Sequence, residues 1–326
     1  MAPGRIARDV VKDLQIAEGA VLEAVSSRNL ERAGEFAREF GFHRALEGEE
    51  AMAEDDEIDL VYIASPHPAH FGTAKRMLLA GKAVLCEKPM TMNAAEAREL
   101  IEISKEKGVF LMEAVWTRCL PIYQVVKNWL AEERIGAGKP RLVSSTFCVG
   151  LSKDPDDRWL NPEMGGGSLL DLGVYPMTVS QLAMGGGAPE DIAVLANFAT
   201  TGVDEMVSAT MRYAHGGIAR FTCGMTTEFE NSLVIGGDRG FIQVPSRFLD
   251  AEEATLTVGD RSETVRAPKR GQGYVHELEE AMRCVRADEI ESPMISHADT
   301  LATMETMDRI REKIGLVYPG EQKRVG

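Results

Sequence analysis

The chain has 326 residues, 44% of them hydrophobic and 27% charged, which is the composition of a folded soluble protein long enough for two domains. The formal net charge of −15 argues against a nucleic-acid partner, because phosphate recognition requires a basic surface. No apolar run approaches the length of a membrane span, and the N-terminus lacks the apolar core of a secretory signal. We therefore expect a cytoplasmic protein without a membrane partner.

The cysteine and histidine patterns argue against a metal centre. The five cysteines are scattered without a Cys-x-x-Cys spacing and are predicted to be reduced thiols in the core. His67 and His70 are close in sequence, but no further cluster of ligands accompanies them. We expect no bound metal.

The first residues match part of a dinucleotide-binding turn, in which a strand, a glycine turn and a helix follow one another. Gly4-Arg5-Ile6-Ala7 leads into an amphipathic helix, with Gly4 at the second glycine position and Ala7 at the third, where alanine is tolerated. Ala2 stands at the first glycine position, and only Met1 precedes it. We therefore expect the first, central strand to be missing through a truncated or mis-set start, with weak stability or cofactor binding as the result. The alternative for Gly4 is an ordinary flexible glycine.

Strands and helices alternate over the first third of the chain. The predicted strands span residues 21–25, 60–64, 83–86 and 109–112, and the predicted helices span residues 29–41, 70–80 and 93–107. Asn29 and Asn93 are expected to cap two of these helices, the second with Glu96 in a capping box, and Gly41 and Gly108 to end them. This alternation predicts a doubly wound parallel sheet, that is, an N-terminal Rossmann domain over residues 1–118.

A second domain is predicted over residues 119–326. Helices are expected at residues 121–131, from Ser168, and at 274–286 and 297–313, and strands at 192–197, 206–213, 218–222, 232–235, 241–244 and 254–258. Runs of strands with short turns predict a large, mainly antiparallel open sheet. The helices suffice to cover one face only, so we expect a homodimer through the other face.

A lysine follows the predicted strand at residues 83–86, in the turn Glu87-Lys88-Pro89. Ligands of open parallel sheets bind beyond the carboxyl ends of the strands, where this lysine lies. Pro89 holds the backbone of Lys88 extended. Taken alone, the turn is also consistent with a solvated lysine before an ordinary turn proline.

Four stretches together resemble the glucose–fructose oxidoreductase and inositol dehydrogenase family, and nearly the whole chain fits it. They are Ala80-Gly81-Lys82-Ala83-Val84-Leu85-Cys86-Glu87-Lys88-Pro89, Met112-Glu113-Ala114-Val115-Trp116-Thr117-Arg118, Gly165-Gly166-Gly167-Ser168-Leu169-Leu170-Asp171-Leu172-Gly173-Val174-Tyr175 and Gly273-Tyr274-Val275-His276-Glu277. The closest resemblance is to the branch of dimeric dihydrodiol dehydrogenases and NADP-dependent xylose dehydrogenases. It implies an oxidoreductase that transfers hydride between a nicotinamide and a cyclic diol or aldose hydroxyl.

The resemblance also implies a catalytic group formed by Lys88, Asp171 and Tyr175. Asp171 and Tyr175 are four apart on a predicted helix and share one face. A phenol with a pKa near 10 is a poor base at neutral pH, and a nearby ammonium favours the phenolate. Lys88 provides that ammonium, and Asp171 orients either partner. The alternative is a buried tyrosine bonded to a structural aspartate.

NADP is expected rather than NAD, because no acid follows the second strand, and Ser27 and Arg28 there can receive a 2′-phosphate. A surface arginine is the alternative for Arg28. The expected cofactor-binding residues are Gly4, Arg5, Ile6, Ser27, Arg28, Ser65, Pro66, His67, His70, Glu87 and Lys88. For His70, the alternative is an ordinary helix residue without a cofactor contact. The expected substrate-binding residues are Trp116, Arg118, Arg158, Asn161 and Tyr175, and a role in loop structure is the alternative for Arg158 and Asn161.

Two other functions stay open at this stage. One is a different sugar or inositol dehydrogenase within the same family. The other is a dinucleotide-binding protein with impaired catalysis, because the glycine turn is incomplete. Turnover with NADP separates the enzymes from the binding protein.

Overall fold

The computed structural model describes residues 4–151, 154–245 and 247–321. The chain divides into two compact units, one made of residues 1–119 and 269–300 and the other of residues 120–268 and 301–326. Residues 269–300, which the sequence pattern places after the domain boundary at 118, thus pack with the first unit. Ala2, which stands at the first position of the glycine turn, lies outside the described residues.

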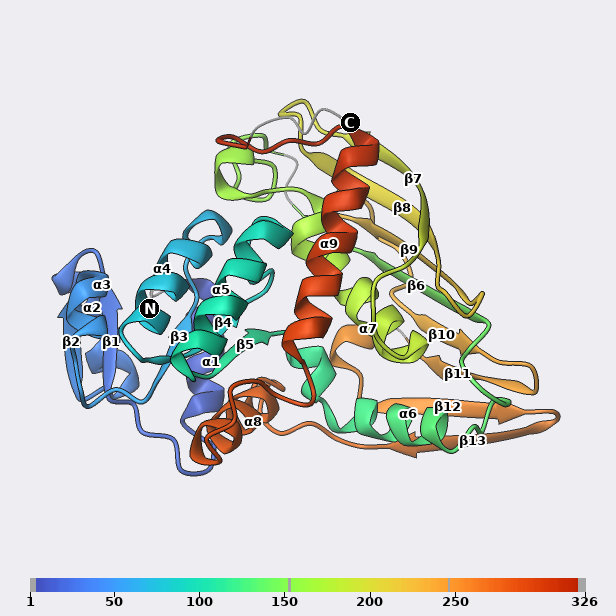
Figure 1. The fold of residues 1–326 in the computed structure, drawn as a ribbon, viewed down its shortest axis with the longest axis horizontal. Coiled ribbons are helices and arrows are strands. Elements are labelled where there is room, and N and C mark those ends of the chain that lie inside the picture. Colours follow the sequence, from blue (N-terminus) through green and yellow to red (C-terminus); the bar gives the residue numbers. More distant parts are fainter. Residues whose placement is uncertain (1–3, 152–153, 246, 322–326) are drawn as a thin grey trace. The chain divides into compact units, whose positions relative to one another are not determined.

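The first unit alternates strands and helices. In chain order its elements are α1 (Arg5–Leu14), β1 (Ala24–Ser27), α2 (Leu30–Phe40), β2 (Arg44–Glu47), α3 (Gly48–Ala53), β3 (Leu60–Ile63), α4 (His67–Leu79), β4 (Ala83–Glu87), α5 (Ala94–Lys107), β5 (Leu111–Ala114), the 3₁₀ turn η1 (Trp116–Cys119) and α8 (Val275–Arg286) (Figure 1). Every strand pair is parallel, as a strand–helix alternation requires. The predicted Rossmann class is therefore confirmed.

The parallel strands form two separate sheets, β1–β2 and β3–β4–β5. The strand β4 is buried along its whole length and lies between β3 and β5, so that Val84 is in register with Val61 on one side and Leu111 on the other. A continuous apolar run is typical of such a strand, which is covered on both faces.

Helix-capping signals locate the helix ends well. The side chain of Asn29 accepts a hydrogen bond from the backbone N–H of Arg32 at 2.9 Å, and Gly41 ends α2 in the left-handed conformation at φ +82°. Asn93 accepts from the N–H of Glu96 at 3.0 Å in the same way. The carboxylate of Glu96 accepts from the N–H of Met92 at 3.1 Å, which completes a variant of the predicted capping box.

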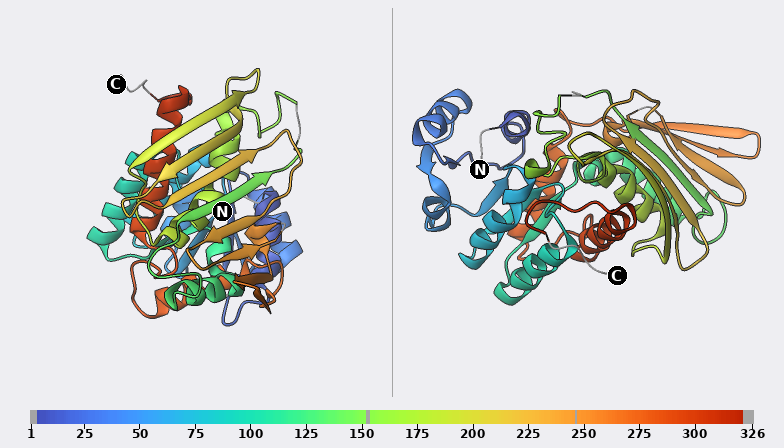
Figure 2. Two further views of the ribbon diagram at one scale, coloured as in Figure 1. Left: turned by 90° about the vertical axis from the view of Figure 1, so that its right-hand side faces the viewer. Right: turned by 90° about the horizontal axis from the view of Figure 1, so that it is seen from above.

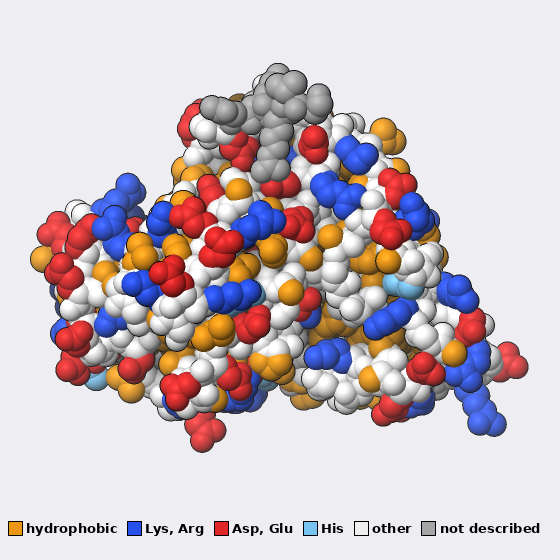
Figure 3. Space-filling view, viewed as in Figure 1, with side chains coloured by type: hydrophobic (Ala, Val, Ile, Leu, Met, Phe, Trp, Pro, Cys, Tyr) orange, Lys and Arg blue, Asp and Glu red, His pale blue; other side chains and the backbone are white. Residues whose placement is uncertain are grey.

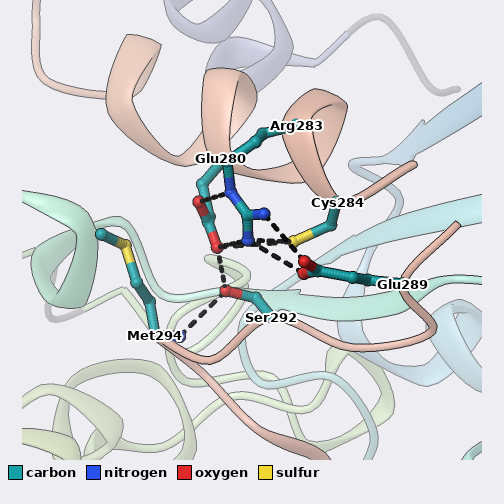
Figure 4. A network of polar contacts seen from close by, with 6 residues as sticks. All are labelled: Glu280, Arg283, Cys284, Glu289, Ser292 and Met294. Carbon is teal, nitrogen blue, oxygen red and sulfur yellow. Dashed lines mark hydrogen bonds and ion pairs between the residues drawn. The ribbon is translucent and has the colours of Figure 1, made fainter. Parts of the chain in front are cut away.

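Residues 269–300 join the first unit through backbone and polar contacts. The N–H of Leu111 donates to the carbonyl of Ile290 at 3.0 Å, so the segment after α8 lies beside the first residue of β5. Figure 4 shows the network that holds this segment: Arg283 of α8 pairs with Glu280 and Glu289, and the hydroxyl of Ser292 donates to Glu280 at 2.6 Å. The contact between Leu111 and Ile290 joins residues far apart in the chain and leaves no local sequence pattern.

The second unit is built on one large sheet. Its strands are β6 (Leu142–Cys148), β7 (Asp191–Phe198), β8 (Asp204–Arg212), β9 (Ile218–Gly224), β10 (Leu233–Gly236), β11 (Gly240–Val244), β12 (Glu253–Val258) and β13 (Arg261–Arg266), in the order β13-β12-β11-β10-β6-β9-β8-β7. Its helical elements are α6 (Pro121–Ala131), the 3₁₀ turns η2 (Pro162–Met164) and η4 (Phe248–Asp250), the π-helical turn η3 (Leu169–Gly173), α7 (Val174–Met184) and the part of α9 (His297–Ile314) that follows Thr300.

All neighbouring strands of this sheet are antiparallel except β6 and β9, which run parallel. The prediction of a mainly antiparallel sheet is confirmed. The helices α6 and α7 pack against one face, and Figure 2 shows the strands of the other face without a covering helix among the described residues.

Acidic and basic side chains are interspersed over the face drawn in Figure 3, which shows no continuous basic patch. Among the described residues, no helix combines the length and apolar character needed to cross a membrane. All five cysteines are buried and free, as predicted.

Candidate functional site

Lys88 lies in a turn whose conformation is fixed by its neighbours. The hydroxyl of Tyr62 on β3 donates to the carboxylate of Glu87, and the second oxygen of that carboxylate accepts from the N–H of Lys88 at 3.2 Å. Glu87 is buried and Lys88 is half-buried at the carboxyl end of β4. The Lys88–Pro89 peptide bond is cis. The turn therefore presents one lysine from a fixed backbone.

Glu113 of β5 holds the same turn from the other side. One of its carboxylate oxygens accepts from the N–H of Met90 at 2.9 Å, and the other accepts from the hydroxyl of Thr300 at 3.0 Å. Burial raises the pKa of Glu113 to about 7, against the opposing effects of these hydrogen bonds and of the positive charge of Lys88. Glu113 lies within the stretch of residues 112–118 that resembles the family, but the sequence gives no signal for this contact.

His70 ties two turns together. It is fully buried, and its Nδ1 and Nε2 lie 2.9 Å from the carbonyl of Pro89 and 2.7 Å from the carbonyl of Ser65. Burial lowers the pKa of His70, so the neutral ring donates to one of the two carbonyls. Both ring nitrogens face the backbone, which gives His70 a positioning role; its predicted cofactor contact stays a prediction. His67 begins α4, with its ring edge-on to that of His70 at 5.7 Å.

The amino end of α1 lies at a small basic pocket. Gly4 is the residue before the helix, and a side-chain carbon built on it would meet no atom within 4 Å. The pocket has a volume of about 370 Å³ and is lined by Gly4, Arg5, Arg8, Arg32, Glu35 and Phe36. Open backbone at a helix N-terminus with several guanidinium groups fits the phosphates of a dinucleotide. Ser27 is half-buried and Arg28 is exposed at the end of β1.

Arg8 and Arg32 were missed in the sequence analysis. Arg8 pairs with Glu39, and its guanidinium lies 5.4 Å from the centre of the Phe36 ring. The three-residue spacing of Arg5 and Arg8 on one helix is the signal that could have identified the first of them.

Trp116 and Arg118 lie in η1 within the first unit, and both are buried. The ring of Trp116 lies 4.8 Å from that of Tyr274, and Arg118 donates to Asp299 at 3.3 Å. Both residues therefore have partners within their own unit. The first unit holds these two residues, the Lys88 turn and the basic pocket.

A buried carboxyl of the 273–277 motif also lies in this unit. Glu277 of α8 is fully buried, and neither of its carboxylate oxygens has a hydrogen-bond partner among the described residues. Burial, together with the negative charges of Glu87 and Asp13, raises the pKa of Glu277 well above its ordinary value. This environment favours the protonated carboxyl.

In the second unit, a glycine turn positions the helix that carries Asp171 and Tyr175. A side-chain carbon on Gly166 would lie 2.7 Å from the carbonyl oxygen of Trp159 and 2.9 Å from that of Arg158, so the chain packs closely there only with glycine. Gly167 has φ +115°.

Asp204, at the start of β8, anchors this turn. Its carboxylate accepts from the hydroxyl of Ser168 and the N–H of Leu169, both at 2.7 Å. Burial raises the pKa of Asp204 to about 6, while the hydrogen bonds act in the opposite direction. Asp204 lies 36 residues from Ser168 in the chain, and the sequence analysis missed it.

The helix begins as a π-helical turn, η3, and continues as α7. A π turn widens the helix, so the i,i+4 spacing of Asp171 and Tyr175 does not have the simple geometry of an α-helical face. Asp171 and Tyr175 are 4% and 8% exposed. The guanidinium of Arg158 lies 3.8 Å from the carboxylate of Asp171, and the ring of Tyr175 packs edge-on against Phe147 at 5.5 Å.

Asn161 caps η2 by accepting from the N–H of Glu163 at 2.9 Å. The predicted site residues therefore fall in two groups, one in each compact unit. Among the described residues, no group of three or more His, Cys, Asp and Glu side chains is arranged to hold a metal ion.

Comparison with known proteins agrees with these features. Residues 2–115 match the family described as "Oxidoreductase family, NAD-binding Rossmann fold", and residues 123–243 match the GFO/IDH/MocA C-terminal domain. The chain is 34% identical over 307 residues to trans-1,2-dihydrobenzene-1,2-diol dehydrogenase of Sus scrofa, covering 92% of this chain and 90% of that protein. It is 33% identical over 333 residues to the protein of the same name from Oryctolagus cuniculus, covering 99% of each.

A solved structure is similar over most of the chain. The 3-ketoreductase KijD10 from Actinomadura kijaniata, in complex with TDP-benzene and NADP, has a TM-score of 0.80 and 26% identity and covers 95% of both chains. The family profile and the curated relatives both span the two units described above. The chain therefore belongs to the GFO/IDH/MocA family of NAD(P)-dependent oxidoreductases.

Proposed function

We propose that this protein is an NADP-dependent dehydrogenase of a cyclic diol or an aldose, with Lys88, Tyr175 and Asp171 as its catalytic residues. The observation that carries the proposal is the fixed turn of Lys88, held by Glu87, Glu113 and His70 at the carboxyl end of a buried parallel strand. A lysine held in this way is typical of a residue that meets a ligand. The dihydrodiol dehydrogenases to which the chain is similar support the diol, and the NADP complex of the 3-ketoreductase supports the cofactor.

The proposed proton transfer uses residues of this chain only. Tyr175 takes the proton of the substrate hydroxyl, and the ammonium of Lys88 favours its phenolate form. Asp171, paired with Arg158, orients Tyr175 or Lys88. Bound NADP supplies the hydride acceptor.

The cofactor is proposed to bind the first unit. Gly4, Arg5 and Ile6 would hold the pyrophosphate, and Ser27 and Arg28 the 2′-phosphate. Ser65, Pro66, His67, Glu87 and Lys88 would line the nicotinamide side. Trp116, Arg118, Arg158, Asn161 and Tyr175 are the proposed substrate contacts. We propose further that the protein is cytoplasmic and forms a homodimer through the uncovered face of the large sheet.

A panel of diols and aldoses with NADP, and separately with NAD, tests this function by the absorbance of reduced nicotinamide. We expect turnover with at least one cyclic diol or aldose and a preference for NADP. The Lys88→Met variant is the matched control for background oxidation. Cofactor binding without turnover on any of these substrates would instead support a binding protein with impaired catalysis, and turnover restricted to inositols or other sugars would support the other dehydrogenase.

A further inference from the structure

A short segment after α9, residues 315–321, packs against the glycine turn of the second unit. Tyr318 lies in this segment and is buried, and its hydroxyl donates to the carbonyl of Gly166 at 2.6 Å, across 152 residues of sequence. Burial, together with the negative charge of Asp204, raises the pKa of Tyr318 well above its ordinary value. The phenol therefore keeps its proton and stays a donor to the turn.

One buried guanidinium holds Tyr318 in place. Arg311 of α9 lies over the Tyr318 ring, 5.3 Å from its centre. The same guanidinium pairs with Asp308 at 2.7 Å and with Glu321 at 2.9 Å. The carboxylate of Glu321 in turn accepts from the backbone N–H of Tyr318 at 3.0 Å. Charge-assisted bonds of this kind close residues 318–321 into a loop on the end of α9.

The bond at Gly166 reaches Asp171 through the backbone of the turn. The N–H of Gly167 donates to the carbonyl of Trp159 at 2.9 Å, and the carbonyl of Gly167 accepts from the N–H of Asp171 at 3.3 Å. Tyr318 thus holds the residue directly before the one that bonds Asp171. A shift of the turn at Gly166 is passed to the first turn of the helix that carries Asp171 and Tyr175.

Tyr318 and Asp204 confine Gly167 from the same side. A side-chain carbon built on Gly167 would lie 2.5 Å from Oδ1 of Asp204 and 3.0 Å from the hydroxyl of Tyr318. Oδ1 of Asp204 has no hydrogen-bond partner among the described residues, while Oδ2 accepts from Ser168 and Leu169. The phenol hydroxyl and the carboxylate therefore border one small space, and the turn cannot move into it without a clash.

We infer that Tyr318 is a positioning residue for the reaction, because its bond to the carbonyl of Gly166 fixes the turn from which Asp171 and Tyr175 project. The inference rests on the proposed catalytic role of those two residues. Proton transfer is sensitive to placement, and a misplacement of about 1 Å can cost about a hundredfold in rate. A purely structural bond would instead stabilise the fold and leave the rate of the chemical step unchanged.

The Tyr318→Phe variant removes the hydroxyl alone. Tyr123→Phe is the matched control, because Tyr123 is also buried in the second unit and donates to a backbone carbonyl, that of Phe248 in η4, at 2.9 Å. Each variant leaves one carbonyl without its donor, so both should lower the melting temperature by a similar amount, about 2–4 °C. Only Tyr318→Phe should lower kcat, by about tenfold or more, with KM within about twofold of the wild type.

Hydrogen exchange of the backbone amides at residues 167–175, without substrate or cofactor, tests the turn itself. Exchange should be faster in Tyr318→Phe than in Tyr123→Phe. This measurement needs no turnover, so a wild type that oxidises no diol or aldose rejects the proposed function, while exchange still decides whether Tyr318 fixes the turn. Equal exchange in the two variants overturns the inference.

The kinetic results decide in the same way. A kcat that Tyr318→Phe leaves unchanged, or that both variants lower equally, shows a bond with a structural role only and overturns the inference. Where Tyr318→Phe does not fold, Glu321→Gln replaces it, because this change weakens the pair with Arg311 that closes the loop around Tyr318. Unchanged kcat and unchanged exchange in Glu321→Gln would then overturn the inference.

Discussion

The backbone N–H of Met90 donates to the carboxylate of Glu113 at 2.9 Å, two residues after Lys88. This bond joins the turn after β4 to the next strand of the sheet. The second oxygen of Glu113 accepts from Thr300, so the carboxylate also links the turn to the start of α9. A buried acid thus organises the backbone on which the proposed catalytic lysine lies.

The Glu113→Gln variant should have a flatter dependence of stability on pH. The pKa of Glu113 is raised from an ordinary value near 4.5 to about 7, so the folded state binds its proton more tightly than the unfolded state. The stabilisation is therefore complete below about pH 4.5 and is lost as the pH rises to about 7, by up to about 3 kcal/mol. Melting temperatures from pH 4.5 to 8 measure the difference between the two proteins. Parallel curves for wild type and variant would contradict the assignment.

Lys88→Met and Tyr175→Phe should each abolish turnover while leaving the melting temperature within a few degrees of the wild type. The two residues are proposed to act as one proton-transfer unit, so the double variant should be no slower than either single variant. Single-turnover rates with saturating NADP measure the effect. Lys82→Met is a matched lysine control, because Lys82 precedes the same strand and bonds the carbonyl of Asp55. Near-normal turnover in either single variant would remove that residue from the proposed mechanism.

Arg28→Ala should weaken NADP binding by about tenfold or more and change NAD binding little. The expected cause is loss of a charge-assisted contact to the 2′-phosphate, which NAD lacks. Arg28 is exposed at the end of β1, so its removal should not affect folding. Titration of both cofactors in their reduced forms, followed by the fluorescence of the reduced nicotinamide, gives the ratio of dissociation constants. An equal loss for the two cofactors would show that Arg28 does not read the 2′-phosphate.

Gly166→Ala should destabilise the second unit by about 1–3 kcal/mol or more, because the new methyl group would lie 2.7 Å from a backbone carbonyl oxygen. Gly72→Ala is the matched control. Gly72 lies in α4 with no atom within 4 Å of the built carbon, and alanine there should stabilise the helix by about 0.5–1 kcal/mol. Denaturant titrations of both variants test the contrast. A Gly166→Ala variant as stable as the wild type would mean that the turn at 158–167 has room to move.

Local signals in the sequence predicted much of this fold. The caps Asn29 and Asn93 and the glycines after α2 and α5 set helix ends that the structure reproduces. The strand β6 was missed because Ser145 occupies an inward position and interrupts its apolar alternation. The pair β2 and α3 was missed because Arg44–Glu47 has no apolar alternation at all.

The candidate site was predictable from the sequence only where a site residue lies next to a recognisable local pattern. The Lys88 turn follows directly from a buried strand, so a local pattern indicates it. Glu113 and Asp204 act through hydrogen bonds to backbone groups that are distant in sequence, at Met90 and at Leu169. The residues next to Glu113 and Asp204 in the sequence do not indicate such contacts. The π-helical start of the helix that carries Asp171 depends in the same way on packing around Gly173, where a side-chain carbon would lie 3.3 Å from Cys223.

We expect a homodimer to form through the uncovered face of the large sheet. This face is rich in hydroxyl side chains that bond across strands, such as Thr222 with Ser208 at 3.1 Å and Thr255 with Thr264 at 2.8 Å. Exposed apolar side chains accompany them, including Leu195, which is 81% exposed, and Phe241. Hydroxyl-bearing strands with scattered apolar groups can pack against a second copy.

Light scattering at micromolar concentration should therefore give the mass of a dimer. Replacing Thr222 and Ser208 by Glu places four like charges at the centre of a two-fold interface and should shift the protein to the monomer. Gln124→Glu is the matched control, because Gln124 is exposed on α6, which packs on the opposite face of the sheet. Unchanged circular dichroism would show that the double variant still folds. A monomeric wild type would contradict the homodimer. A dimer that survives the double substitution would show that the contact lies elsewhere.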